Sequence, residues 1–264
     1  MRKFLFILSV LLYFSLHLSG QDLRKVENRA FKTGEMLKYR VFYDSWVTSW
    51  LTAGYGTMVV SESQQKFHQR DVVQIQVTGK STGLFNLFYK VDDRFESYVD
   101  TGAMIPWLFV RRTHEGKYTY EDDVTFEQYD HIAKSRRKEK PVPENVQDII
   151  SAFYFMRTMD FDSAKKNNEY YLNFFLDDSV YTSRIIFLGK EIVETDMGKF
   201  RCLKFKPQVA SGGIFQEPYP MVLWVTDDRN KIPILAKSAV FIGSVSMELI
   251  EYRGLMYPIE AVIP

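Results

Sequence analysis

The segment Leu37-Lys-Tyr-Arg-Val-Phe-Tyr43 places an apolar or aromatic side chain at every second position, with Lys38 and Arg40 among the residues between them. A period of two with one apolar face is typical of a half-buried antiparallel strand. The segment Val73-Gln-Ile-Gln-Val-Thr78 repeats the pattern. Both segments therefore predict strands that bury one face and expose the other to water.

Similar short runs continue along the chain at a spacing of roughly ten residues, which is typical of an antiparallel β-protein. They lie at residues 116–132, 170–187, 200–205, 221–225, 232–241 and 245–252. Turn-forming residues separate them, namely Gly116-Lys117, Asp177-Asp178, Gly189-Lys190, Met197-Gly-Lys199 and Asp227-Asp-Arg-Asn230. A sheet with this many strands must curl or close to protect its edges. We therefore predict a mainly β fold, formed by a large twisted antiparallel sheet or a curved half-barrel.

One segment has a helical period instead. Its apolar residues fall on one helical face, at Val146, Ile149, Ile150, Phe153 and Tyr154. Pro143 and Glu144 suit a helix start, and Arg157 suits its end. We expect one principal helix over residues 146–159, packed against the concave side of the sheet.

Asp148 and Ser151 are polar residues within this otherwise apolar segment, one helical turn apart on the same side. If that side faces the sheet, both must be hydrogen-bonded. We interpret them as structural polar residues, with a catalytic role as the alternative.

The composition limits the class of protein. With 264 residues, of which 46% are hydrophobic, the chain can bury a sizeable core. A net charge of +1 gives no basic field for nucleic acid, so we expect no nucleic-acid partner. Cys202 is the only cysteine, which rules out an intramolecular disulfide and a cysteine-rich zinc site. We predict no cofactor.

The N-terminal region has the features of a secretory signal peptide. Arg2 and Lys3 precede a largely apolar run up to Ser19, and Gly20 is a small residue at which cleavage can occur. An N-terminal membrane anchor is the alternative, but the run is shorter than the roughly 20 residues that span a bilayer. We therefore predict a signal peptide at residues 1–20, cleavage after Gly20 and a periplasmic or secreted protein. After its removal we expect no transmembrane span.

Two meander-like halves, residues 31–138 and 168–262, flank the predicted helix. No linker rich in Gly, Ser or Pro divides them. We predict a lead-in at residues 21–30 and a single β-rich domain at residues 31–264.

Four pairs of adjacent aspartates could bind calcium or supply the carboxylates of a glycosidase: Asp92-Asp93, Asp122-Asp123, Asp177-Asp178 and Asp227-Asp228. Neighbouring residues on a strand point to opposite faces, however, and the last two pairs fall where hairpins should turn. We interpret all four pairs as residues of turns or solvated faces. Mature histidines occur singly, at His68, His114 and His131, so we predict no metal site.

The remaining candidate motifs are weak. Cys202 lies in a strand-like run, which favours a buried thiol over a nucleophile. The basic run from Lys134 to Lys140 could contact lipid phosphates, but a solvated connector is the simpler interpretation. Neither a nucleophile elbow nor a dinucleotide-binding loop is present.

Five sequence segments follow one another along the chain, and their order and spacing are informative. They are Phe31-Lys-Thr-Gly-Glu-Met-Leu-Lys-Tyr39, Ser97-Tyr-Val-Asp100 with Pro106, Val146-Gln-Asp-Ile-Ile-Ser-Ala-Phe-Tyr154, Gly198-Lys-Phe-Arg-Cys-Leu-Lys-Phe-Lys-Pro207 and Trp224-Val-Thr-Asp-Asp-Arg-Asn-Lys-Ile-Pro233. Together they resemble the exported bacterial family catalogued as domain of unknown function 3108. The resemblance implies an exported, mostly antiparallel β-protein. It implies no reaction, because the family has none assigned.

Two classes of function follow from these observations. The first is a non-catalytic periplasmic binding or scaffold protein that holds an apolar ligand, such as a lipid acyl chain, or an envelope protein partner. The second is a hydrolase whose catalytic groups converge from distant strands. The lack of a nucleophile, metal or phosphate motif favours the first class over an enzyme.

Aromatic residues are abundant in segments that should line one side of the sheet. Sheet-and-helix shells with wide aromatic inner faces can leave a cavity, although the same residues could close-pack as core. The predicted pocket residues are Phe85, Phe88, Tyr89, Trp107, Phe109, Phe153, Phe155 and Trp224.

Overall fold

The computed structural model describes residues 22–44, 51–207, 221–239 and 244–264. The predicted signal peptide and its cleavage site therefore lie outside the described residues. No helix within the described ranges is long and apolar enough to cross a membrane.

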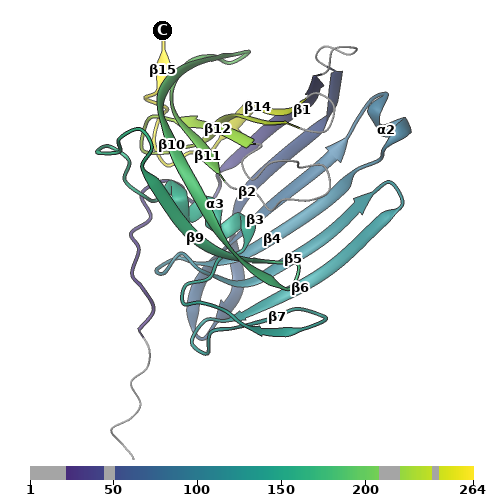
Figure 1. The fold of residues 1–264 in the computed structure, drawn as a ribbon, viewed down its shortest axis with the longest axis vertical. Helices are drawn as coiled ribbons and strands as arrows, with labels where there is room; N and C mark the ends of the chain where they lie inside the picture. Colours follow the sequence, from purple (N-terminus) through teal and green to yellow (C-terminus); the bar gives the residue numbers. More distant parts are fainter. Residues whose placement is uncertain (1–21, 45–50, 208–220, 240–243) are drawn as a thin grey trace, which may run out of the picture.

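The described strands form one antiparallel sheet that is not closed (Figure 1). Its first half contains β1 (Met36–Asp44), β2 (Leu51–Phe67), β3 (Arg70–Ser81), β4 (Asp92–Asp100), β5 (Pro106–Glu115), β6 (Tyr118–Glu127), β7 (Ile132–Lys134) and β8 (Glu139–Pro141). Its second half contains β9 (Glu169–Leu176), β10 (Ser179–Thr195), β11 (Gly198–Pro207), β12 (Met221–Thr226), β13 (Pro233–Ala239) and β14 (Ser244–Arg253). The short β15 (Val262–Ile263) pairs with β11. The predicted mainly β fold is confirmed.

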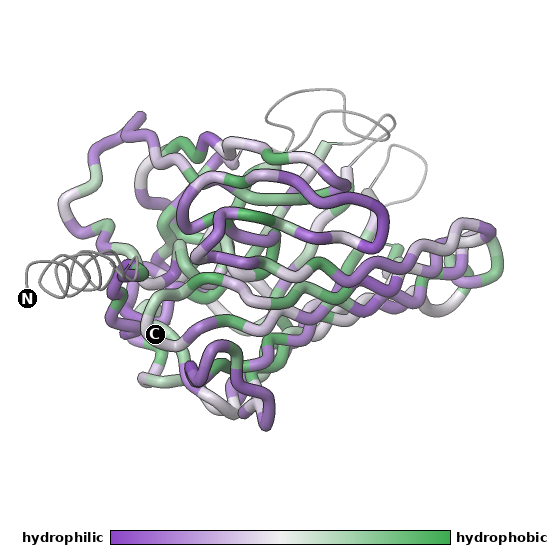
Figure 2. Tube along the Cα trace, turned by 90° about the horizontal axis from the view of Figure 1, so that it is seen from below, coloured by the Kyte–Doolittle hydropathy of each residue, from purple (hydrophilic) through white to green (hydrophobic). Residues whose placement is uncertain are grey.

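The two halves meet in the middle of the sheet, where β1 pairs with β14. From this seam β2 to β8 run outward on one side, and β13 to β9 run outward on the other. Hydrophobic and hydrophilic residues alternate along the strands, as the period of two predicts (Figure 2). The turn residues Asp177 and Asp178 both have positive φ, at 48° and 58°. These angles are those of a two-residue hairpin turn whose twist matches the flanking strands.

The sheet curls until its two ends approach each other. Gln147, in the connection from β8 to β9, forms a parallel bridge with Phe174 of β9. At the β9–β10 turn, Arg111 pairs with Asp177 at 3.0 Å and Arg137 pairs with Asp178 at 3.0 Å. These contacts hold the β9–β10 hairpin across the strands of the first half.

The principal helix is α3 (Ile149–Arg157), which is shorter than predicted. The prediction that it starts near residue 146 is wrong, because Asp148 is its N-cap with extended φ and ψ of −94° and 179°. Gln147 before it is held in extended pairing with β9. At the other end Thr158 is the C-cap, so Met159 lies outside the helix. The other described helix, α2 (Phe85–Phe88), is a single turn between β3 and β4.

The helix α3 lies inside the curl, between β9 and the long strands of the first half (Figure 1). Ile150 and Tyr154 on one side of it are buried in a core cluster with residues of β2 to β6. Phe31 completes this cluster, and its ring meets Tyr154 edge-on at 4.7 Å. The opposite side of α3 faces the second half of the sheet.

Candidate functional site

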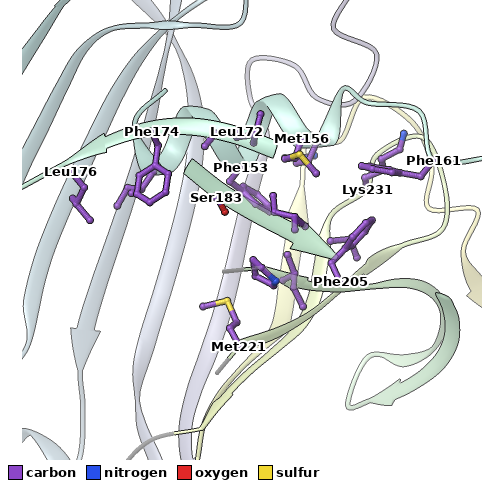
Figure 3. Close-up of a pocket in the computed structure, with 17 residues that line it drawn as sticks. Phe153, Met156, Phe161, Leu172, Phe174, Leu176, Ser183, Phe205, Met221 and Lys231 are labelled. Carbon is purple, nitrogen blue, oxygen red and sulfur yellow. The ribbon is translucent and has the colours of Figure 1, made fainter. Parts of the chain in front are cut away.

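An apolar cavity of about 520 Å³ lies between α3 and strands β9 to β12 (Figure 3). Its apolar lining comes from six parts of the chain: Ile149, Ala152, Phe153 and Met156 of α3; Phe161 after it; Leu172, Phe174 and Leu176 of β9; Ile185 of β10; Phe205 and Pro207 of β11; and Met221, Leu223 and Val225 of β12. The volume is within the range of roughly 300–1,000 Å³ that is typical of small-molecule sites.

Strand alternation explains the β9 wall. Leu172, Phe174 and Leu176 are two residues apart and therefore point to the same face, which is the cavity. Phe175 between them is buried against Phe126 of the first half, with ring centroids 6.2 Å apart. On that second face Phe175 is the buried residue, whereas Tyr171 is 59% exposed.

Three lining residues carry polar side chains: Arg157, Ser183 and Lys231. Arg157 is neutralised, since its guanidinium makes a two-bond pair with the buried Glu35 at 2.6 and 2.8 Å. Burial lowers the pKa of the Lys231 ammonium, although Asp160, Asp162 and Asp228 oppose this effect from a distance. Lys231 therefore offers the cavity a partly desolvated positive charge.

The Arg157–Glu35 pair also fixes the position of α3. Both side chains are at most 1% exposed. Arg157 further donates to the carbonyl oxygens of Asn230, at 3.0 Å, and Ala30, at 3.3 Å. The end of the helix is thereby tied to the chain before β1 and to the turn between β12 and β13.

Asp148 and Ser151 are fully buried and form a capping box at the start of α3. The Asp148 carboxylate accepts from the backbone N–H groups of Ile150 and Ser151, at 2.7 and 2.8 Å, and from the Ser97 hydroxyl at 2.5 Å. The Ser151 hydroxyl in turn accepts from the Asp148 N–H at 2.9 Å. Burial is the largest influence on the Asp148 carboxyl and raises its pKa to about 6. Neither side chain lines the cavity.

Among the eight predicted pocket aromatics, Phe153 is the one that lines this cavity. Phe109 is buried in the core cluster on the other side of α3, and Phe155 packs against that cluster. The Arg24 guanidinium covers the Phe155 ring at 3.9 Å, while its N–H groups donate to the carbonyl oxygens of Ala103 and Met104. Phe109 and Phe155 therefore pack with the core instead of lining the cavity.

The other predicted aromatics lie elsewhere. Trp107 is 1% exposed and donates to the buried Asp100 at 3.1 Å. Trp224 belongs to the core cluster around β13 and donates to Glu191 at 3.1 Å, because its neighbours Leu223 and Val225 take the face toward the cavity. Phe85, Phe88 and Tyr89 lie in and beside α2, where Phe88 is 87% exposed. These aromatics were predicted as pocket residues from their residue type alone. Their actual positions depend on which face of each strand they occupy and on how the sheet curves.

Sequence reasoning missed the cavity residues of β9 to β12. The segment Tyr170-Tyr-Leu-Asn-Phe-Phe-Leu176 carries a usable signal, since Leu172, Phe174 and Leu176 recur with a period of two and indicate one apolar face. No comparable signal identifies Lys231, because it approaches the cavity from the turn before β13.

The aspartate pairs have structural roles, but two of their members are not solvated. Asp93 and Asp122 are 9% and 5% exposed, which corrects the prediction of a solvated face for these two residues. Each is compensated by hydrogen bonds, since Asp93 accepts from the His114 N–H and Asp122 from the Arg136 N–H. Asp228 accepts from five groups around the β12–β13 turn, as expected of a turn aspartate: Thr226, Asn230, Lys231, Glu260 and Ala261.

The remaining candidates show no constellation of reactive groups. Burial raises the pKa of the Cys202 thiol to about 12, which disfavours the nucleophilic thiolate. Within the described ranges, no group of three or more His, Cys, Asp and Glu side chains could hold a metal ion. The basic run forms the β7–β8 hairpin, where Arg136 pairs with Asp123 at 2.5 Å. Arg137, as noted above, reaches Asp178, so both guanidiniums already have carboxylate partners.

A protein family matches most of this chain. The model of the family described as protein of unknown function (DUF3108) covers residues 38–250. The chain belongs to this family. The resemblance seen in the sequence is thus confirmed, and the family description assigns no activity. No curated protein matches the sequence.

Two solved structures are similar to this member of the DUF3108 family. A β-barrel-like protein of domain of unknown function DUF1849 from Brucella abortus is 13% identical, with a TM-score of 0.55, over 89% of this chain and 100% of that chain. A putative lipoprotein from Parabacteroides distasonis is 11% identical, with a TM-score of 0.37, over 88% of this chain and 100% of that chain. The first similarity supports a β-barrel-like fold and says nothing of function.

Proposed function

We propose that this protein is a non-catalytic binding protein of the bacterial periplasm that holds an apolar ligand, a single acyl chain, in the cavity beside α3. The observation that carries the proposal is the cavity itself, whose lining is apolar except at Arg157, Ser183 and Lys231. Burying an acyl chain there contributes about 0.8 kcal/mol for each methylene group removed from water. The predicted signal peptide supports the periplasmic location, where a lipid needs shelter from water.

The charges around the cavity indicate how the ligand lies. Arg157 is already paired with Glu35, which leaves Lys231 as the lining cation that has no ion pair among the described residues. An anionic head group beside Lys231 restores the interactions that its ammonium loses on burial. We therefore propose a fatty acid or a similar anionic single-chain amphiphile, with its carboxylate at Lys231 and its tail between α3 and β9.

The hydrolase alternative gains no support from this site. The lining, as far as the structure describes it, contains no carboxylate, histidine or cysteine side chain. Hydrolysis needs a general acid or base, and Lys231 is the one lining residue without an ion pair among the described residues that could supply it.

A titration of a fluorescent fatty acid into delipidated protein tests the proposal. We expect saturable binding at micromolar ligand. Ser183→Phe adds a ring to the cavity wall and should weaken binding at least about tenfold, since the ring displaces the volume that the tail needs. Thr182→Phe is the matched control, because Thr182 is the exposed neighbour of Ser183 on β10 and points to the other face.

Two results would contradict the proposal. One is the absence of saturable binding to the wild-type protein at micromolar ligand. The other is equal affinity of the Ser183→Phe and Thr182→Phe variants, which would place the ligand outside the cavity.

A further inference from the structure

The tip of the sheet formed by α2 and the β5–β6 turn exposes an unusual concentration of apolar side chains. Leu87 is 77% exposed and Phe88 is 87% exposed, the highest values for large hydrophobic residues in the described part of the chain. Leu84 and Tyr89 next to them are 64% and 44% exposed. Tyr118 on the adjacent β5–β6 hairpin adds a ring that is 50% exposed.

Two backbone contacts join these two turns into one surface. Gly116 donates its N–H to the carbonyl of Lys90 at 2.7 Å, and Val91 forms a bridge with Glu115. The Tyr89 ring lies on Gly116, where a Cβ atom would come within 3.2 Å of it. Gly116 also has a φ of +60°, which favours glycine. We call Leu84, Leu87, Phe88, Tyr89 and Tyr118 the apolar tip.

Polar contacts, not apolar burial, hold the conformation of α2. No residue of this four-residue helix is buried. The Ser81 hydroxyl donates to the Asn86 side chain at 2.7 Å and accepts from the Val91 N–H at 2.8 Å. The Tyr89 N–H donates to the Phe85 carbonyl at 2.9 Å. The fold therefore presents the apolar side chains without using them for its own packing.

Charges of both signs lie beside the apolar tip, but two of its lysines have no carboxylate partner in the described part of the chain. Lys90 and Lys117 are exposed and have no ion pair among the described residues, while Lys80 is paired with Asp92 at 3.2 Å. The other nearby carboxylates are those of Asp93 and Glu115. Asp93 is 9% exposed, and burial together with the neighbouring Asp93 raises the pKa of Glu115.

We propose that the apolar tip is a membrane-docking site that inserts into the interface of an anionic lipid bilayer. Apolar and aromatic side chains flanked by lysines are the combination that binds such interfaces, with the apolar part buried roughly 5–10 Å below the headgroups. The tip projects at the outer end of the molecule, where Figure 1 places α2 at the right-hand side and Figure 2 shows apolar chain at the same end. Nothing in this inference depends on the cavity binding a ligand.

Flotation with vesicles tests the inference, using equal parts of phosphatidylcholine and phosphatidylglycerol, or phosphatidylcholine alone. We expect the wild-type protein to float with the anionic vesicles and less with the neutral ones. The double variant Leu87→Ser and Phe88→Ser should lower the vesicle partition coefficient at least about tenfold. The double variant Lys90→Gln and Lys117→Gln should lower it for anionic vesicles only, because it removes charge and no apolar surface.

Ile192→Ser is the matched control, since Ile192 is also an exposed apolar residue, at 63%, but lies on β10. It should float as the wild type does, and so should the cavity variant Ser183→Phe, which separates this inference from the proposed ligand. Failure of the wild type to bind anionic vesicles would overturn the inference, as would equal binding by the Leu87→Ser and Phe88→Ser variant. A concentration-dependent dimer that this variant abolishes, without vesicle binding, would assign the apolar tip to a second copy of the chain instead.

Discussion

The two sides of α3 are similar in composition and different in packing. On the side of the first half, Ile150 and Tyr154 are 5% and 0% exposed and belong to a close-packed cluster. On the side of the second half, Phe153 and Met156 border a cavity of about 520 Å³. Both sides are apolar, so hydrophobicity alone does not determine which side is filled.

The difference comes from what each half of the sheet brings to the helix. The segment before β1 places Ala30 and the Phe31 ring against Tyr154 and so fills the space on the first side. On the other side β9 crosses over the helix, with Leu172 and Phe174 directed into the gap. A cavity remains wherever the backbone spacing set by the sheet exceeds the reach of the side chains.

The largest expected effect is on the ion pair that anchors the end of α3. Glu35→Ala leaves the buried Arg157 guanidinium without its carboxylate, and we expect it to lower the free energy of unfolding by about 3–5 kcal/mol. Urea denaturation of the purified protein measures this. Glu27→Ala is the control, because the Glu27–Arg29 pair is about 70% exposed on both sides and its loss should leave the midpoint unchanged. Equal midpoints for both variants would mean that the pair does not hold the helix.

A matched pair of substitutions on α3 probes the comparison directly. Ile150→Ala removes packed methyl groups from the core cluster and should cost about 2–4 kcal/mol. Ile149→Ala, one position earlier, faces the cavity and is 38% exposed, so it should cost less than about 1 kcal/mol. Urea denaturation again reports both values. If the two variants were equally destabilised, the two sides of the helix would not differ in packing.

Loss of the helix cap should have an intermediate effect. Asp148→Ala removes the acceptor of three buried donors, and we expect a loss of about 1–3 kcal/mol of stability. An unchanged unfolding midpoint would show that Asp148 does not satisfy these donors.

The stability contributed by Asp148 should depend on pH. The folded protein holds the pKa of this carboxyl at about 6, above its ordinary value of 3.8, because burial disfavours the charge. The folded state therefore keeps a proton that the unfolded chain releases between about pH 4 and pH 6. The contribution of Asp148 is largest below about pH 4, declines by up to about 3 kcal/mol as the pH rises to 6, and is constant above that.

Denaturation curves of the wild type and of Asp148→Asn across this range measure the contribution. We expect the wild type to lose stability relative to the variant between pH 4 and pH 6, because asparagine does not titrate. Parallel pH profiles would show that the carboxyl has the same pKa in both states.

The smallest expected effect concerns Lys231 and rests on the proposed ligand. Lys231→Met removes the charge but keeps an apolar stem in the lining. The affinity for a fatty acid should fall by about threefold to tenfold, as expected for a partly exposed ion pair. The affinity for the corresponding fatty alcohol should stay the same. An equal loss for both ligands would mean that Lys231 does not contact the head group.

The sequence predicted the architecture well, because each strand carries its own signal. The alternation from Leu37 to Tyr43 needs no knowledge of the partner strands, and neither do the turn residues Asp177 and Asp178. The helix was placed correctly, but its start was predicted too early, since the apolar spacing that includes Val146 does not reveal that Gln147 pairs with β9. The sequence around Asp148 is compatible both with a position inside the helix and with the N-cap that the structure shows.

The sequence predicted a cavity near the helix, which is where the structure has one. Of the eight predicted lining residues, however, only Phe153 lines it. Phe109, Phe155 and Trp224 are as apolar as Phe174 and Leu172, so composition could not separate them. Their positions depend on which face of each strand points toward α3 and on how far the sheet lies from it.

The sequence by itself determined the strands, the turns, the family and the presence of one buried helix, because these follow from residue spacing within short segments. Only the tertiary structure decided that α3 packs tightly on one side and borders a cavity on the other, and that Phe88 lies on an exposed tip. Both outcomes depend on the curvature of the sheet, which arises from the summed twist and bulges of many strand pairs. No single segment contains that sum, so only the assembled sheet shows where side chains meet and where they leave a space.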